Sequence, residues 1–340
     1  MTLVWVLLTV QAAAVPQAAD EANKGLALAR EGKYELAISH YQAAIAQNPH
    51  LPGIHLNLGL AYFKLNRLGE AAPAFEQATQ ADPSSFQARA LLGMTYYALR
   101  RYGDAAAQLK LASDRQPDNI ELRYQLAQSY MQSKQYAEAV GEFRFLLTKN
   151  PDSAPVHVLL GEVLDAANQT DKAAAEFEAA AKAGPREPQV HFGLGYLYWK
   201  QRRFEDARRE FQAELANVPE QPQALAYLGD TEMHAGDSTL AAGHLREALK
   251  LDPKLRLAHL DLGIVLAGAG DAPGAESHFR EAIRLDPSRP DAHYRLGRLW
   301  SSLGRTQDAE AEFAKVKELG NQEPPPPLIS VPGPNGEPKP

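Results

Sequence analysis

The chain has no cysteine among its 340 residues. This excludes disulfide bonds, thiolate metal sites, cysteine nucleophiles and lipid attachment through cysteine. It also lacks an excess of basic charge, because 42 acidic residues outnumber 35 basic ones and the formal net charge is −7. Non-specific nucleic-acid binding needs a concentrated basic surface, so we expect no nucleic-acid partner. β-Branched residues are sparse beyond the first fifteen positions, and the abundant Leu, Ala, Gln, Glu and Arg favour helix.

Charge is entirely absent from residues 1–19. An apolar run from Leu3 to Val10 is followed there by Ala12, Ala13 and Ala14, a pattern typical of a secretory signal peptide cleaved after Ala14. The run is too short to span a bilayer unaided. We therefore expect residues 1–19 to be a signal peptide or an N-terminal membrane anchor, and a segment with neither role is the alternative. The corresponding location is exported, periplasmic or cell envelope, with the cytoplasm as the alternative.

Catalytic signatures are missing as well. The sequence contains no phosphate-binding Gly-x-x-x-x-Gly-Lys-Ser/Thr, no Gly-x-Ser-x-Gly and no His-Glu-x-x-His. The glycine-rich stretch 268–274 follows no strand, so a nucleotide-binding loop is not expected there. We predict that the protein is not an enzyme and needs no cofactor and no metal.

What the sequence does contain is an internal repeat with a constant period. The period is set by prolines that recur at one fixed interval, namely Pro49, Pro83, Pro117, Pro151, Pro185, Pro219, Pro253 and Pro287. Alanine recurs in the same register from Ala37 to Ala309, and glycine does so from Gly25 to Gly297, with Ala127 as the one replacement. Fixed periods of this size indicate stacked supersecondary units that form a solenoid. We number the positions of each repeat from residue 18, 52, 86 and onward.

Each repeat divides into two amphipathic helices, because its apolar residues are spaced by three and four. In residues 52–85 the first helix is expected over 53–65 and the second up to 81, with a break at Asn66 and a stop before Pro83. Proline is favoured at the first position of a helix. We therefore expect helices to begin at the prolines in position one, which are Pro52, Pro188, Pro222 and Pro290.

The pattern Leu58-Gly59, Tyr62, Ala71, Phe75, Ala78 and Pro83 resembles the tetratricopeptide repeat consensus. The resemblance implies an all-α fold, a right-handed α-solenoid superhelix of nine tandem helix-turn-helix repeats over residues 20–323. Lys24 and Lys317 replace apolar residues of the inner repeats, so we expect them to face solvent at the two ends of the array. Residues 324–340 are rich in proline and are expected to form a disordered tail. The apolar residues Leu328, Ile329 and Val331 leave docking of that tail as the alternative.

Histidine occupies position four in five repeats, as His55, His157, His191, His259 and His293. Equivalent residues of successive repeats are separated by packed helices, each about 8–10 Å wide. This is too far for one metal ion, whose bonds to nitrogen are about 2.0–2.1 Å long. We expect these rings to be partly buried packing residues, and metal binding or proton sensing is the alternative. Glu138, Glu142 and Glu176 of the second helices are expected on a solvated face.

The resemblance also implies that the first helix of each repeat lines an inner, concave groove through positions two, five, six, nine, twelve and thirteen. Aromatic anchors with a polar surround are typical of peptide-binding surfaces, and the alternative is that the rings fill gaps between helices. The predicted partner-binding residues are Tyr124, Gln125, Gln128, Phe192, Tyr196, Trp199, Lys200, Tyr227, Arg295 and Arg298. The family's clamp for chaperone C-termini, with Lys at position five and Asn at position nine, is absent.

These features predict a non-catalytic scaffold that binds a protein or an extended peptide in the bacterial cell envelope. Resemblance to periplasmic tetratricopeptide proteins implies an assembly, secretion or export complex. The alternative is a non-catalytic regulatory or adaptor subunit of an enzyme such as a glycosyltransferase. Membrane contact is expected only through the N-terminal segment, and the sequence carries no signal of oligomeric state.

Overall fold

The computed structural model describes residues 16–320, and over this range the chain forms eighteen α-helices and no strand. They are α1 (Pro16–Arg30), α2 (Tyr34–Gln47), α3 (Ile54–Lys64), α4 (Leu68–Ala81), α5 (Phe86–Ala98), α6 (Tyr102–Arg115), α7 (Ile120–Gln132), α8 (Tyr136–Lys149), α9 (Ala154–Ala166), α10 (Thr170–Ala183), α11 (Val190–Lys200), α12 (Phe204–Asn217), α13 (Pro222–His234), α14 (Ser238–Leu251), α15 (Arg256–Gly268), α16 (Ala272–Leu285), α17 (Pro290–Ser302) and α18 (Thr306–Gly320). The prediction of an all-α solenoid of tandem helix-turn-helix repeats is confirmed. Within the described range, no helix is long and apolar enough to cross a bilayer.

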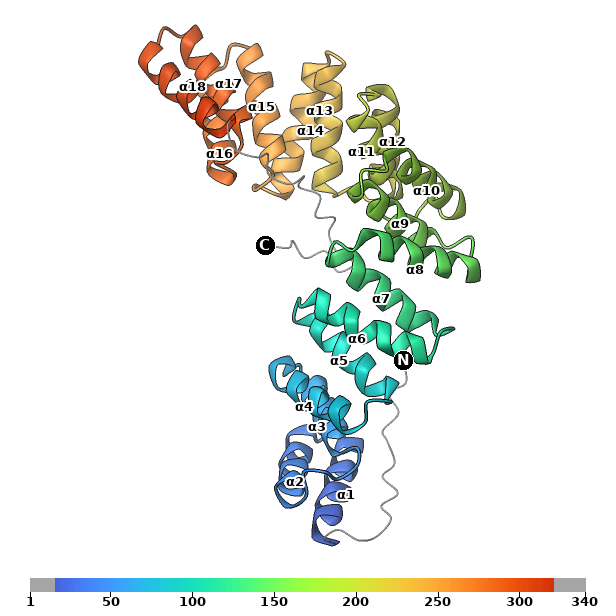
Figure 1. The fold of residues 1–340 in the computed structure, drawn as a ribbon. Helices are drawn as coiled ribbons and strands as arrows, with labels where there is room; N and C mark the ends of the chain where they lie inside the picture. Colours follow the sequence, from blue (N-terminus) through green and yellow to red (C-terminus); the bar gives the residue numbers. More distant parts are fainter. Residues whose placement is uncertain (1–15, 321–340) are drawn as a thin grey trace. The chain divides into compact units, whose positions relative to one another are not determined.

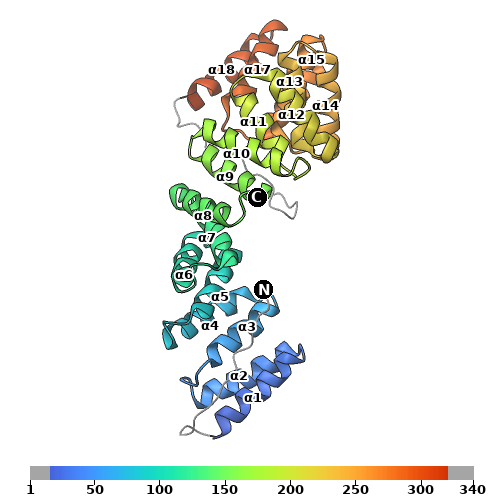
Figure 2. The same ribbon diagram turned by 90° about the vertical axis from the view of Figure 1, so that its right-hand side faces the viewer.

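The chain divides into two compact units between Ala183 and Gly184. We call them the N-unit, with α1–α10, and the C-unit, with α11–α18. Within each unit the helices pair in sequence as antiparallel hairpins, and each hairpin packs on the next (Figure 1). Figure 2 shows the same hairpins from a second side, with α13 beside α15 in the C-unit. Residues 1–15 and 321–340 lie outside the described range, which begins with α1 at Pro16. The signal segment predicted over residues 1–19 and the proline-rich tail therefore stay predictions.

Small residues at position eight let the two helices of a hairpin approach closely. A Cβ atom added at Gly263 would lie 2.6 Å from the ring of Phe279 on the facing helix, and one added at Gly195 would lie 2.7 Å from the ring of Phe211. Both rings are fully buried or nearly so. The glycine and the aromatic ring therefore form one packing unit, because a larger residue at position eight would overfill the interface.

Every hairpin turn between residues 16 and 320 contains one residue with a left-handed backbone, in the same register of each repeat. It is glycine at Gly32, Gly236, Gly270 and Gly304, but Asn66, Arg100, Lys134, Asn168 and Arg202 elsewhere. The following amide donates to a carbonyl of the preceding helix, as from Arg203 N to Tyr198 O at 2.8 Å. This is the Schellman arrangement, which satisfies the last carbonyls of the first helix. It fixes the turn even where the left-handed residue is not glycine.

The prediction that helices begin at position-one prolines is right at Pro222 and Pro290 and wrong at Pro52 and Pro188. Helices α3 and α11 start later, at Ile54 and Val190, because Gly53 and Gln189 adopt left-handed conformations with φ of 71° and 74°. At α11 the start is held by Glu214 of α12, which is fully buried. Its carboxylate accepts hydrogen bonds from the amides of Gln189 at 3.0 Å and Phe192 at 3.1 Å.

The residue at position four connects its helix to two other segments. His157 contacts the carbonyl of Pro151 through Nε2 at 2.8 Å and the carboxylate of Glu176 through Nδ1 at 2.7 Å. One contact is to the carbonyl at the end of the preceding repeat, and the other is to a side chain on the second helix of the same repeat. We call this pair of contacts the position-four clip. His191 with Glu210 and Arg123 with Glu142 form the same clip.

The clips correct one sequence prediction. Glu142 and Glu176 do not lie on a solvated face, because their side chains are only 13% and 23% exposed and each is bonded to a clip residue. Glu138, in contrast, is exposed as expected. The clips also give His157 and His191 a specific role, since each links the end of the preceding repeat to the second helix of its own.

Candidate functional site

The first helices of the C-unit repeats lie next to one another: α11 contacts α13, α13 contacts α15, and α15 contacts α17. We call the surface formed by positions two, five, six, nine, twelve and thirteen of these helices the A-helix face. Successive helices bring position nine of one repeat next to position six of the following one. Side chains from different repeats therefore meet on this face.

Four aromatic rings gather at its beginning. The Tyr227 ring lies 5.5 Å from the Tyr196 ring, 5.1 Å from the Trp199 ring and 5.9 Å from the Phe192 ring, in edge-to-face contacts. The Tyr196 and Trp199 rings stack at 5.9 Å. Such pairs add to the stability that burial provides. Phe192 is buried, whereas Tyr196, Trp199 and Tyr227 are partly exposed.

Two buried acids follow the rings. Asp230 accepts a hydrogen bond from the Trp199 indole Nε1, and it is also hydrogen-bonded to Asp261 of α15. Both carboxyl groups are nearly inaccessible, with 4% and 3% exposure. Burial raises the pKa of Asp261 well above its ordinary value, and the neighbouring Asp230 raises it further. The two acids therefore share a proton that each would lose in water.

The far end of the face is basic. Arg295 and Arg298 are exposed on α17 at positions six and nine, and Asp291 at position two of the same helix is paired with Arg256 at the start of α15. The guanidinium of Arg298 lies 3.5 Å from the hydroxyl of Tyr294. The face thus passes from aromatic rings through a buried acid pair to exposed positive charges. A surface of this kind offers ring faces, hydrogen-bond acceptors and cations to a ligand that runs across several helices.

The predicted residues of the N-unit stand on one helix. Tyr124, Gln125 and Gln128 are all half-buried on α7. Burial raises the pKa of the Tyr124 phenol, and the charges of Glu162 and Glu121 raise it further. The Gln125 amide donates to Glu121 at 3.4 Å. These three residues form a second polar and aromatic patch, which belongs to the N-unit alone.

The structure therefore brings together Phe192, Tyr196, Trp199 and Tyr227, with Lys200 Nζ 5.6 Å from the centre of the Tyr196 ring. Arg295 and Arg298 lie beyond the acid pair on the same face. Sequence reasoning missed Asp261, although it occupies position six of repeat eight and pairs with position nine of repeat seven. An aspartate at position nine of one repeat and another at position six of the next repeat would have predicted this acid pair.

Family models described as tetratricopeptide repeat match residues 22–86, 56–120, 192–255 and 260–324, and a further one matches residues 130–191. No curated protein matches the sequence. Among solved structures, the chain resembles the APC/C hetero-tetramer Cut9–Hcn1 at 13% identity, over 90% of this chain and 74% of that one, with a TM-score of 0.58. YrrB, a TPR protein with an unusual peptide-binding site, is 21% identical over 52% of this chain and 91% of its own, with a TM-score of 0.44. MamA is 20% identical over 47% of this chain and 94% of its own, with a TM-score of 0.42.

Proposed function

Because the chain belongs to the tetratricopeptide repeat family, whose members are commonly protein–protein interaction scaffolds, we propose that it is a non-catalytic scaffold. It binds a peptide or a protein segment along the A-helix face of the C-unit. The observation that carries the proposal is the cluster of Tyr196, Trp199 and Tyr227 beside the buried Asp230, four side chains contributed by two adjacent helices. Aromatic anchors with a polar surround are the residues that carry binding energy at protein interfaces.

The contacts within the cluster suggest how a ligand is held. Tyr196 and Trp199 retain partial exposure, so an apolar or cationic side chain of the partner can pack against the rings. Lys200, Arg295 and Arg298 are exposed and supply charge at the rim. Charges at the rim of an interface contribute mainly to the association rate and to specificity. We therefore assign the affinity of the complex to the rings and its selectivity to the cations.

The double variant Tyr196→Ala with Trp199→Ala tests the site. We expect it to lose capture of binding peptides from a displayed random-peptide library, because truncating central aromatic residues typically costs about 2 kcal/mol or more at each anchor. Far-UV circular dichroism should still show the helices. The matched control is Tyr198→Ala on the same helix, since the Tyr198 ring instead packs under Arg203 at 4.2 Å. Equal capture by the double variant and the wild type would refute the site.

The cell envelope is the location that we propose for this scaffold. The proposal rests on the uncharged segment 1–19 with its apolar run. Fusion of residues 1–30 to a reporter that folds only outside the cytoplasm should give activity, and Leu7→Arg within the apolar run should abolish it. An inactive wild-type fusion would place the protein in the cytoplasm and leave the binding site unaffected.

A further inference from the structure

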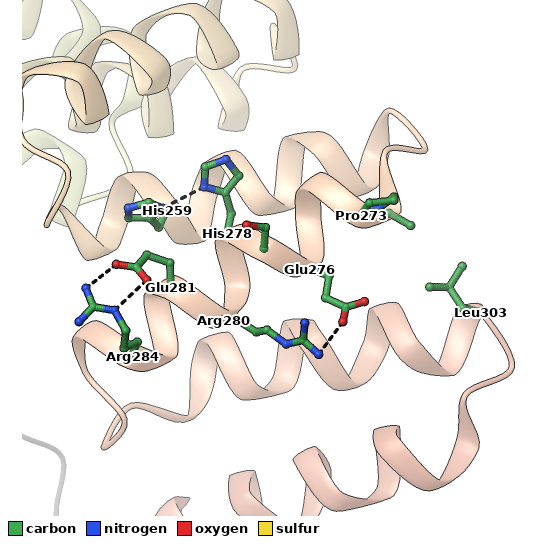
Figure 3. A pocket seen from close by; sticks show the side chains of 10 residues that line it. His259, Pro273, Glu276, His278, Arg280, Glu281, Arg284 and Leu303 are labelled. Atoms are coloured by element: carbon green, nitrogen blue, oxygen red, sulfur yellow. Dashed lines mark hydrogen bonds and ion pairs between the residues drawn. The ribbon is translucent and has the colours of Figure 1, made fainter.

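The position-four clip of repeat eight differs from the others in its chemistry. It holds His278 where the equivalent position of repeats five, six and nine holds a glutamate. His259 Nδ1 lies 2.9 Å from His278 Nδ1, and His259 Nε2 lies 3.1 Å from the carbonyl oxygen of Pro253. Figure 3 shows the two rings pointing toward one another from α15 and α16.

Hydrogen-bond donors and acceptors define the protonation of this pair. A carbonyl oxygen only accepts, so His259 Nε2 must carry the proton that it donates to Pro253. In a neutral ring the other nitrogen, Nδ1, then has a lone pair, which points at His278. In the His–Glu clips of repeats five and six, by contrast, both ring nitrogens face oxygen atoms, one of a backbone carbonyl and one of a carboxylate. Among the clips described here, that of repeat eight therefore directs an imidazole lone pair at a second imidazole.

The second ring is also available as a ligand. Burial lowers the pKa of His278, and the charges of His259 and Arg246 lower it further, while Asp271 opposes them. The two Nδ1 atoms face one another at 2.9 Å, so both rings can direct a nitrogen at one ligand between them. A backbone carbonyl that fixes the tautomer of a histidine is the usual support of a metal-binding ring.

The separation of the two nitrogens suits a metal ion. With bonds of about 2.0 Å, two nitrogens in adjacent corners of a square-planar site are separated by about 2.8 Å, and those in a tetrahedral site by about 3.3 Å. The observed 2.9 Å lies between these values and close to the first.

Solvent can complete the coordination shell. His259 and His278 line a surface cavity of about 1010 Å³, together with Glu281 and Arg284 of α16. Glu281 pairs with Arg284 at 2.5 Å, and its carboxylate is close enough to His259 for their charges to interact (Figure 3). Within residues 16–320 no cluster of three or more histidine or acidic side chains is arranged for a metal ion. The pair therefore supplies two ligands, and water supplies the others.

We propose that His259 and His278 form a binding site for one divalent transition-metal ion of the kind that prefers imidazole, namely copper, nickel or zinc. The ion takes the place of the proton between the two Nδ1 atoms, and His278 stays a neutral imidazole because its one proton moves to Nε2 through exchange with water. It links α15 to α16 where repeats five and six use a histidine and a carboxylate. Comparison of histidines at the same position of successive repeats could not find this site, because its second ligand lies on the other helix of the same repeat.

The test uses the full chain without a histidine tag, and the probes are Cu²⁺ and Zn²⁺ in calorimetric titrations. The chain has 10 histidines, so the variants must separate this site from background binding. His278→Glu recreates the clip of repeats five, six and nine, which preserves the fold while replacing one imidazole by a carboxylate. We expect it to weaken the tightest site at least about tenfold. Nitrogen couplings in the Cu²⁺ electron paramagnetic resonance spectrum should show two imidazoles in the wild type.

Glu176→His is the converse variant. It turns the clip of repeat five into a second His–His pair, so we expect two tight ions per chain rather than one. Identical titrations of the wild type and His278→Glu would overturn the proposal, as would an absence of tight binding to the wild type. Failure of Glu176→His to add a site would show that a facing pair of imidazoles is not sufficient, and would also overturn it.

Discussion

Replacement of Glu214 by alanine tests how the helix that carries the aromatic cluster is positioned. Position 27 is alanine in most repeats, including Ala44, Ala180 and Ala248. In repeat six it is a fully buried glutamate whose two oxygens accept from the amides of Gln189 and Phe192. Two opposing effects therefore meet at one side chain, the desolvation of a charge and the capping of a helix.

The magnitudes favour capping. Removal of the carboxylate leaves two amide donors without partners, at about 1–3 kcal/mol each when they are buried, and it removes a favourable interaction with the helix N-terminus of about 0.3–1 kcal/mol or more. The substitution also removes the desolvation cost of the buried carboxylate. This cost is several kcal/mol for an unpaired ion but smaller where hydrogen bonds satisfy the ion. We predict that Glu214→Ala destabilises the C-unit by about 2–4 kcal/mol.

The assay is urea unfolding combined with native-state hydrogen exchange, since repeat arrays do not always unfold in one step. Exchange should accelerate most in α11 and α12, and the amide of Phe192 should lose its protection. Gln212→Ala, an exposed position of α12, is the control and should change stability by less than about 0.5 kcal/mol. A Glu214→Ala protein as stable as the wild type or more stable would show that desolvation prevails and would refute the capping argument.

Three further predictions follow from the same packing. Gly263→Ala should destabilise repeat eight by about 1–2 kcal/mol in urea unfolding, because its Cβ would overlap a buried ring. At Gly243 an added Cβ would have no atom within 4 Å, so Gly243→Ala should instead stabilise the protein by about 0.5–1 kcal/mol. Equal effects of the two substitutions would contradict this packing argument. Arg202→Gly should stabilise by about 0.5–1 kcal/mol, since its φ of 59° strains a residue with a side chain; a loss of stability would show that the arginine makes contacts worth more than the strain. Because burial raises the pKa of Asp261, the folded protein binds more protons than the unfolded chain between pH 3.8 and that raised pKa, so stability should fall as pH rises across this window. Asp261→Asn should remove this fall in pH-dependent thermal melts, and an unchanged pH profile would contradict the shared proton of Asp230 and Asp261.

The fold was predictable because each repeat specifies its own hairpin. Glycine at position eight and an aromatic or leucine residue at position 24 belong to the same hairpin, so their contact is local and is visible in the sequence. The expected exposure of Lys24 and Lys317 at the ends of the array is likewise confirmed. The starts of α3 and α11 were not predictable from proline alone. They depend on the left-handed conformations of Gly53 and Gln189, and the second of these is stabilised by Glu214 on the following helix.

The candidate site was predictable in part. The repeat positions of Tyr196, Trp199 and Tyr227 predicted that the three side chains share one face. In the structure these rings are in contact. The extent to which each ring is buried depends on how closely neighbouring helices pack. The period of the sequence gives no information on the distance between helices. The partners of Glu142 and Glu176 were missed for a related reason, since each is bonded to a residue on the other helix of its hairpin.

Site-specific photo-crosslinking tests the central claim most directly. A photoreactive amino acid replaces Lys200 on the A-helix face of the chain in one sample, and Arg209, an exposed residue of α12, in the other. Each protein is irradiated in a lysate of its own organism, and crosslinked partners are identified by mass spectrometry. The proposal predicts a dominant partner crosslinked from position 200, absent from position 209, and lost when Tyr196 and Trp199 are replaced by alanine. Crosslinks of equal yield from both positions, or crosslinks that survive the double replacement, would contradict binding on the A-helix face.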